Sequence, residues 1–444
     1  MPFRRAAYRT FRSAAALQHV LVRRLTPAGR LVLAGLAAAA IIGPNTRLTV
    51  AYQAFTFLVA LLAIATALSA RVPPRLGVRR RLPRFGTAGE PLGYTVTLHN
   101  PTGRVQSGLV LMEDLEDPRP TFEVFVSQRE PGEERRNWFD RTVGFPRWAW
   151  LVARARRAAI EARLLPPLPP RQEVDVRIEV TPVSRGSLRF TGVTVARPDP
   201  LGLVCSLVEM AAPASILVLP RRYPLPRFEL PGARRHQPGG VALATSVGDS
   251  EEFLSLRDYR PGDPLRRIHW RSWARAGRPV VKELHDEFFV RHALLLDTFL
   301  PPGGDARFEE AVSVAASFAG GAGAQDALLD LMFVGPEAYT FTAGRGVGHV
   351  DRMLEILASV RPCTDRAFAT LADLVVSRHT GLSGAICVFV VWDDARRALI
   401  DTLRGLGIPV LVLLVEDAAL PGAAEPDGVH RLTVGSIAQG LARL

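Results

Sequence analysis

The stretch over residues 385–415, AICVFVVWDDARRALIDTLRGLGIPVLVLLV, decides the fold of the C-terminal part of the chain. Ala385–Trp392 predicts a buried strand that ends at Asp393, Ala395–Leu406 predicts an amphipathic helix, and Ile408–Val415 predicts a second buried strand. Because a helix that joins two apolar strands is typical of a parallel pair, the stretch predicts a β-α-β unit inside an α/β domain.

The sequence before and after this unit continues the alternation of apolar strands and amphipathic helices. Strands are predicted at Ala293–Leu296 and Leu328–Val334, and helices at Asp305–Ala319, His349–Val360, Arg366–Arg378 and Ile437–Leu444. We therefore expect residues 291–444 to form a doubly wound α/β domain, with a parallel sheet covered by helices on both faces.

Length and composition leave room for more than one domain. The chain has 444 residues, a mass of 48.4 kDa, 48% hydrophobic residues and a mean hydropathy of +0.13. The three cysteines, Cys205, Cys363 and Cys387, form no C-x-x-C pair, which excludes a disulfide scaffold and a cysteine-rich zinc module.

The positive charge is confined to the N-terminal part of the chain. Residues 1–89 contain fourteen arginines and no acidic residue, so they carry +14 against a total of +12 and leave −2 for the remaining residues. This balance argues against nucleic-acid binding by the rest of the chain, because phosphate contacts require a surplus of lysine and arginine.

Two apolar stretches predict a transmembrane helical hairpin over residues 28–70. Val50–Leu68 is 19 residues without a charge, close to the ~20 that cross a bilayer core, and Leu31–Gly43 is shorter. Arginines in the basic segment 1–27 and after residue 70 place both ends, and the soluble part, on the cytoplasmic side. We expect these arginines to attract anionic lipid headgroups, since no acidic residue is near them in sequence. The alternative, a buried hairpin of a soluble protein, is disfavoured for the same reason. The flanking arginines are Arg23, Arg24, Arg30, Arg71, Arg75, Arg79, Arg80 and Arg81.

The middle of the chain, residues 84–220, has a period of two. Tyr94, Val96 and Leu98 alternate with polar residues, and turns rich in glycine, proline and asparagine separate such stretches. This pattern predicts a β-sandwich-like domain. The insertion at 141–170 predicts an amphipathic helix closed by a proline-rich stop, which either dips aromatic side chains into the membrane interface or packs across the sandwich.

Residues 248–287 read GDSEEFLSLRDYRPGDPLRRIHWRSWARAGRPVVKELHDE and contain eight acidic and eight basic residues. Balanced charge favours an internally paired network, because the arginine fork matches carboxylates with two hydrogen bonds. A turn is expected at residues 261–264, with Ile268, Trp270 and Trp273 as an apolar anchor beside it.

This string resembles the signature of the bacterial "domain of unknown function 58" family. The resemblance implies an N-terminal membrane hairpin, a β-rich stretch that ends near a D-P-x-G-L element, here residues 199–203, and a C-terminal von Willebrand factor A-like domain. The signature segment, residues 221–290, is then strapped to the α/β domain. The family has no established enzymatic activity. The resemblance implies, as partners, a MoxR-type AAA+ ATPase and a transglutaminase-like membrane protein.

The same resemblance makes Asp297 and Asp393 weak candidates for a metal site. Von Willebrand factor A domains begin a cation site with Asp-x-Ser-x-Ser at the end of the first strand. Here Phe299 and Pro301 stand at both serine positions and supply no side-chain oxygen. An aspartate that caps a loop or pairs with an arginine is the favoured interpretation, and no cofactor is expected.

The sequence therefore predicts a non-enzymatic scaffold or adaptor in the bacterial inner membrane that engages the bilayer and protein partners, with no nucleic acid. The first alternative is an uncharacterised hydrolase that uses His269 with a nearby carboxylate, although no Gly-x-Ser-x-Gly elbow is present. The second alternative is nucleic-acid binding. Whether the segment is an interaction surface or an internal strap stays open. The candidate binding residues are Arg257, Asp258, Tyr259, Asp263, Arg266, His269, Trp270, Arg275 and Lys282.

Overall fold

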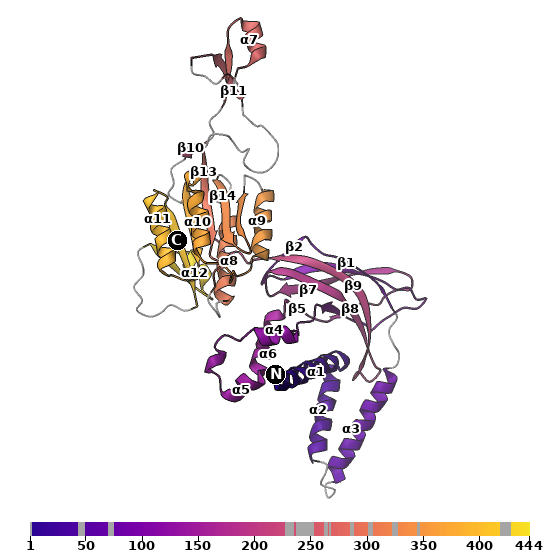
Figure 1. The fold of residues 1–444 in the computed structure, drawn as a ribbon. Helices are drawn as coiled ribbons and strands as arrows, with labels where there is room; N and C mark the ends of the chain where they lie inside the picture. The colour runs from indigo at the N-terminus through magenta and orange to yellow at the C-terminus, as the bar shows by residue number, and fades with distance from the viewer. Residues whose placement is uncertain are drawn as a thin grey trace. The chain divides into compact units, whose positions relative to one another are not determined.

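The computed structural model divides the chain into two compact units, Met1–Leu219 and Pro220–Leu444 (Figure 1). The structure describes residues 2–42, 49–69, 75–226, 235–236, 253–261, 265, 268–284, 288–300, 305–321, 327–343, 347–417 and 428–444. The expected turn between the two apolar helices lies outside these residues, as does most of the turn expected at 261–264.

Three helices open the first unit: α1 (Pro2–Arg24), α2 (Pro27–Ile42) and α3 (Thr49–Leu68). One of them is long and apolar enough to cross a membrane, over Val50–Leu68, and nearly all of that stretch is exposed. The apolar part of α2 is shorter. Large apolar side chains such as Ile41 and Phe57 point to solvent on both helices, which is unfavourable in water and indicates association with a membrane.

The basic segment expected at 1–27 is a long helix, α1, which the sequence analysis missed. Tyr8, Phe11 and Ala15 recur at helical spacing, and they pack in one cluster with Phe125 and Trp148. The arginines that mark this segment as basic lie on other positions of the same helix.

Two sheets form the β-rich part of the first unit. A four-stranded sheet has the order β1-β3-β7-β5, and a five-stranded sheet has the order β2-β9-β8-β4-β6. Val96, Leu98 and Ile178 of the first sheet share one buried cluster with Phe190 and Val195 of the second. The strands are β1 (Gly77–Arg81), β2 (Phe85–Thr87), β3 (Leu92–His99), β4 (Val110–Leu115), β5 (Ala158–Ile160), β6 (Arg163–Leu164), β7 (Glu173–Pro182), β8 (Gly186–Pro198) and β9 (Cys205–Leu219).

The helical insertion, which was predicted at residues 141–170, has other bounds in the structure and packs against another part of the chain. It starts before residue 141 and comprises α4 (Phe122–Ser127), a 3₁₀ turn (Glu133–Arg135), α5 (Trp138–Val143) and α6 (Phe145–Ala155). The helix ends at Ala155 because Arg156 is extended, with ψ 112°, and the chain then forms β5 and β6. Its buried Trp148 and Leu151 pack against Tyr8 of α1, so α1 covers the apolar face that the sequence analysis assigned to the sandwich or the membrane.

The second unit contains a mixed sheet of order β15-β14-β13-β16-β17-β18, with β10 paired to β13. The prediction of an all-parallel sheet is wrong at one edge. Residues 338–343 alternate and return directly after residues 335–337 as an antiparallel strand. β18 was also missed. The strands are β10 (Arg235–His236), β13 (Phe288–Leu296), β14 (Ala327–Val334), β15 (Ala338–Ala343), β16 (Gly384–Phe389), β17 (Val410–Glu416) and β18 (Val429–Thr433).

Helices cover both faces of this sheet. Side chains of α10 and α11 pack with Leu295 and Cys387 in one buried cluster, while α8 contacts β13, β16 and β17 and is almost wholly buried. Tyr223 covers α8: its backbone N–H donates to Ser317 Oγ at 2.7 Å. The helices are α8 (Asp305–Gly320), α9 (Val347–Ser359), α10 (Ala369–Ser377, three residues later than predicted), α11 (Asp394–Gly405) and α12 (Ile437–Leu441).

Candidate functional site

The signature segment folds as a small hairpin of its own, which we call the tryptophan hairpin (residues 253–258 and 268–284). Its strands, β11 (Phe253–Asp258) and β12 (Val280–Leu284), pair antiparallel. Between them lies α7 (Trp270–Ala276), which ends at Gly277 in the left-handed conformation, with φ 67°. Ile268 bridges to Val281, and both are buried, so a minimal apolar core holds the short helix to the strands.

Trp270 and Trp273 form a stacked pair on α7. Their ring centroids are 5.2 Å apart and their planes differ by 17°. Trp270 is 65% exposed, so Ile268 is the one buried residue of the three that were expected to form an apolar anchor beside the turn. The spacing of three residues along this seven-residue helix places Trp270 and Trp273 on the same side, as an i, i+3 pair. An exposed indole stacked on a half-buried one is an unusual feature of a soluble surface and is typical of a contact site.

His269 begins α7. Its backbone N–H donates to Val280 O at 2.8 Å, and its Nδ1 lies 2.7 Å from Ser272 Oγ. Among the described residues no carboxylate is hydrogen-bonded to this imidazole. A hydrogen-bonded His–Ser pair is present, whereas the third member of a catalytic triad is not among these contacts.

The other predicted binding residues fall into two groups: most lie in or next to the tryptophan hairpin, and two lie outside the described residues. Asp258 pairs with Arg278 at 3.1 Å, both partly exposed, and Tyr259 N–H donates to Pro279 O at 3.0 Å. The segment therefore pairs within itself at these positions. The tryptophan hairpin contains Arg257, Asp258, His269, Trp270 and Arg275, and Tyr259 directly follows its first strand. Lys282 lies in β12, where it is paired with Leu256 of β11. Asp263 and Arg266 lie outside the described residues.

Asp297 and Asp393 do lie together, as predicted, but an arginine stands between them. Arg396 donates from Nη2 to Asp297 Oδ2 at 3.1 Å and from Nη1 to Asp393 Oδ2 at 2.5 Å. Its guanidinium also lies 4.1 Å from the centre of the Phe368 ring. Asp393 in addition caps α11 through the Arg396 N–H. The strand-end carboxylates therefore share one internal cation.

Asp297 is fully buried, and its environment shifts its titration. Burial raises the pKa of Asp297 to about 6, although Arg396 and the Phe299 N–H lower it. Within the described residues no group of three or more His, Cys, Asp and Glu side chains is arranged to hold a metal ion. The geometry thus agrees with an arginine-paired aspartate rather than with a hard-cation cage.

Comparison with known proteins identifies part of the chain. Residues 255–425 match the sequence model of the family described as "Protein of unknown function DUF58". We call this region the DUF58 region, after the family that it resembles. The "Uncharacterized protein YeaD" of Bacillus subtilis (strain 168) is 31% identical over 190 residues, which are 42% of this chain and 46% of that protein, so the chain spans about half the length of this curated relative. A solved Salmonella alpha-2-macroglobulin mutant aligns with 39% of this chain and 9% of its own at 13% identity and a TM-score of 0.19, too low to indicate a shared fold.

The DUF58 region contains the tryptophan hairpin from residue 255 onward and the Asp297–Arg396–Asp393 cluster. Its description gives no activity. The resemblance seen in the sequence is confirmed for this region.

A second site lies outside the DUF58 region, at the D-P-L-G-L element of residues 199–203. The sequence analysis quoted this element only as part of the family resemblance and assigned it no structural role. We call it the Asp199 turn (residues 199–204). The Asp199 carboxylate accepts from the N–H groups of Leu201, Leu203 and Val204 at 2.7–2.8 Å. The turn binds the start of α2: Leu25 bridges to Val204, and Thr26 N–H donates to Leu203 O at 3.1 Å. The D-P-L-G-L signal therefore marks the docking point of the apolar helices.

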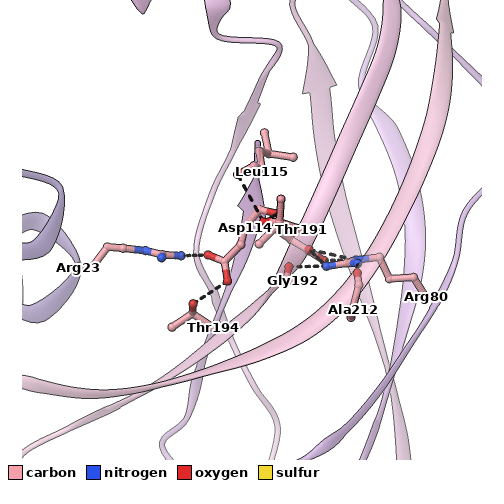
Figure 2. Close-up of polar contacts among 9 residues, drawn as sticks. Arg23, Arg80, Asp114, Leu115, Thr191, Gly192, Thr194 and Ala212 are labelled. Atoms are coloured by element: carbon pink, nitrogen blue, oxygen red, sulfur yellow. Dashed lines mark hydrogen bonds and ion pairs between the residues drawn. The ribbon is translucent and has the colours of Figure 1, made fainter. Parts of the chain in front are cut away.

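Two of the arginines expected to contact lipid are instead paired inside the first unit (Figure 2). Arg23 forms an ion pair with Asp114, whose other oxygen accepts from Thr194 Oγ1 at 2.7 Å. Arg80 pairs with Glu113 at 2.5 Å, and both side chains are buried. Both acidic partners lie in β4, far from Arg23 and Arg80 in the sequence but close to them in the fold. The expectation that these two arginines have no acidic partner and contact lipid was therefore wrong.

Proposed function

We propose that this chain is a non-enzymatic, membrane-anchored adaptor that binds a protein partner through the tryptophan hairpin. The observation that carries the proposal is the exposed Trp270, stacked on the half-buried Trp273 in a small hairpin within the DUF58 region. Tryptophan and arginine contribute most to binding energy at protein interfaces, and α7 presents both, with Arg271 and Arg275 exposed beside the indoles.

The proposal includes two helices in the bilayer and a cytoplasmic soluble part. Support comes from the apolar exposed surface of α3, from the shorter apolar helix α2 beside it, and from the arginines that flank them. We further propose that the two sheets of the first unit form a β-sandwich and that the second unit has a von Willebrand factor A-like fold. The shared core of the sheets and the strand-end Asp297 support these assignments.

The test is affinity capture from detergent-solubilised membranes with the wild type, Trp270→Ala and Trp138→Ala. Trp138 is the matched control, because it is also strongly exposed, at 72%, but lies on α5, outside the DUF58 region. We expect Trp270→Ala alone to lose its partner by tenfold or more, since truncating a hot-spot indole costs about 2 kcal/mol or more. Equal capture by all three proteins would show that the pair is architectural.

A MoxR-type AAA+ ATPase is the first candidate partner, because the family resemblance implies one, and a transglutaminase-like membrane protein is the second. Capture in the presence of a non-hydrolysable ATP analogue, of ADP and of no nucleotide tests the first. Retention of an ATPase that changes with the nucleotide would support it, whereas capture without any ATPase would remove it.

One observation favours a second function, the hydrolase. The 2.7 Å contact between His269 Nδ1 and Ser272 Oγ would activate a serine nucleophile if the imidazole accepted its proton. A fluorophosphonate probe tests this: labelling of the wild type and none of Ser272→Ala would support hydrolysis. Absence of labelling, with partner capture intact in Ser272→Ala, would leave the adaptor.

A further inference from the structure

The N-terminal helix α1 has two apolar faces, and one of them packs inside the protein. Tyr8 stacks edge-on against Trp148 with centroids 5.6 Å apart, and Phe11 meets Phe145 at 5.5 Å. The Tyr8 hydroxyl donates to Pro120 O at 3.0 Å. These contacts hold α1 in a fixed rotation about its axis.

The opposite face of α1 is mostly apolar and is exposed. At 100° per residue, Phe3, Leu17, Val20 and Leu21 fall on the side away from Tyr8, together with the alanines at positions 6 and 14 and the polar residues at positions 10, 13 and 24. Leu17 is 60% exposed and Phe3 is 57% exposed. A soluble helix of this length normally turns polar residues to that side, so this face requires an occupant.

The charges of α1 identify the occupant. The helix contains Arg4, Arg5, Arg9, Arg12, Arg23 and Arg24 and no acidic residue. Arg9 is exposed at the border of the outer apolar face, and Arg24 is exposed at the C-terminal end of the helix, where α2 begins. An apolar face bordered by arginines matches an anionic lipid leaflet, where acyl chains take the apolar side chains and headgroups take the guanidinium groups.

The position of α1 leads to the same occupant. Only Leu25 and Thr26 separate α1 from α2, and both are held by the Asp199 turn. Figure 1 shows α1 crossing the axis of α2 rather than continuing it. If α2 enters the bilayer at Pro27, the end of α1 must lie at headgroup level, and its ion pair with Asp114 through Arg23 fixes it there.

We propose that α1 is an interfacial helix, whose Phe3–Leu17–Leu21 face inserts into the headgroup–acyl boundary of an anionic leaflet. The proposal rests on the membrane anchoring of α2 and α3 in the proposed function. It adds a second, lateral membrane contact, which would fix the orientation of the sandwich on the membrane.

The experiment uses the full chain in nanodiscs of phosphatidylcholine and phosphatidylglycerol, with an environment-sensitive fluorophore at Leu17→Cys. Selective labelling is feasible because Cys205, Cys363 and Cys387 are buried. Phe57→Cys on α3 reports the anchor, and Val105→Cys, in a loop of the β-rich part, reports a water-exposed site. Lipids brominated near the headgroup act as quenchers.

We expect a blue-shifted probe at Leu17→Cys that brominated lipid quenches, about twofold more with brominated phosphatidylglycerol than with brominated phosphatidylcholine at equal mole fraction. A water-like spectrum at Leu17→Cys with quenching at Phe57→Cys would overturn the interfacial helix and leave the anchor. A shielded probe at Leu17→Cys without quenching would overturn it in favour of a protein partner on α1. No quenching at either site would refute the anchor itself.

Discussion

Replacing Arg396 by methionine should destabilise the second unit, and the loss should grow with pH. The substitution keeps the length of the side chain and much of its contact with Phe368, but it leaves the fully buried Asp297 without its cation. Asp393 is partly exposed and can be hydrated instead. The effect therefore isolates the cost of a charge on Asp297.

The magnitude follows from the pKa of Asp297. Burial raises it from 3.8 to about 6 even with Arg396 in place, and a shift of about 2 units is worth about 3 kcal/mol. Because the folded state holds this proton more tightly than the unfolded state, the contribution of Asp297 to stability falls as pH rises from about 4 to about 6 and is then constant. Without Arg396 the folded pKa rises further, so the fall continues above pH 6.

The variant should therefore be close to the wild type near pH 5 and less stable by about 3–5 kcal/mol at pH 8, the usual cost of leaving one partner of a buried ion pair. Hydrogen exchange of peptides from β16 and α11 in the full chain measures this, with protection expected to drop by about a hundredfold or more at pH 8. Arg397→Met is the control, because Arg397 pairs on the surface with the exposed Asp394. Asp297→Asn added to Arg396→Met should restore most of the loss. A pH-independent deficit, or one no larger than that of the control, would refute the reasoning.

Three further substitutions probe the first unit. In Gly29→Ala the new methyl group would clash with Leu203 O, so α2 should separate from the Asp199 turn. Hydrogen exchange at residues 199–204 should then increase. Gly103→Ala is the control, because the space around Gly103 is open and the substitution should leave this exchange unchanged. Asp199→Ala removes the acceptor of three backbone N–H groups and should cost about 3 kcal/mol in urea unfolding of the full chain; a loss under 1 kcal/mol would contradict this role. Arg80→Met leaves Glu113 buried without its partner, so thermal unfolding should occur at a lower temperature by about 6 °C or more, and an unchanged midpoint would show that water reaches the carboxylate.

The elements of the α/β unit could be predicted because each carries its own local signal. The strands around Leu295 and Cys387 are continuous apolar runs, and the helices between them are amphipathic, so their order and approximate bounds were readable. The antiparallel strand at 338–343 is half polar and short, as edge strands are, and its signal was too weak to be separated from a loop. The juxtaposition of Asp297 and Asp393 also followed, because both end parallel strands.

The first unit was less predictable because its helices are defined by distant partners. A run of arginines, alanines and leucines at 1–27 is compatible with a helix, but which side of it is buried depends on Trp148 and Phe125, more than a hundred residues away. The ion pair of Arg23 could not be predicted for a similar reason, because its partner, Asp114, is also far away in the sequence. The sequence also left two alternatives for Trp270, an interaction surface or an internal strap, because tryptophan is intermediate in its preference for the protein interior.

The excess of arginine has a structural consequence that a count of charges does not reveal. The chain contains a single lysine among its 55 basic residues, and two of its buried arginines each donate to several acceptors at once. Arg80 donates to the Glu113 carboxylate and to two backbone carbonyls exposed at the bulge between β8 and β9, and Arg147 donates to Glu133 and to Phe125 O. A lysine could not span these acceptors, because its ammonium is a point donor on a flexible stem, whereas the guanidinium is a planar fork with five N–H groups. Arginines of this kind join elements that are far apart in sequence, whereas exposed arginines of α1 such as Arg9 can contact lipid. If that division is correct, Arg80→Lys should destabilise the first unit almost as much as Arg80→Met, whereas Arg9→Lys should leave both folding and membrane association unchanged.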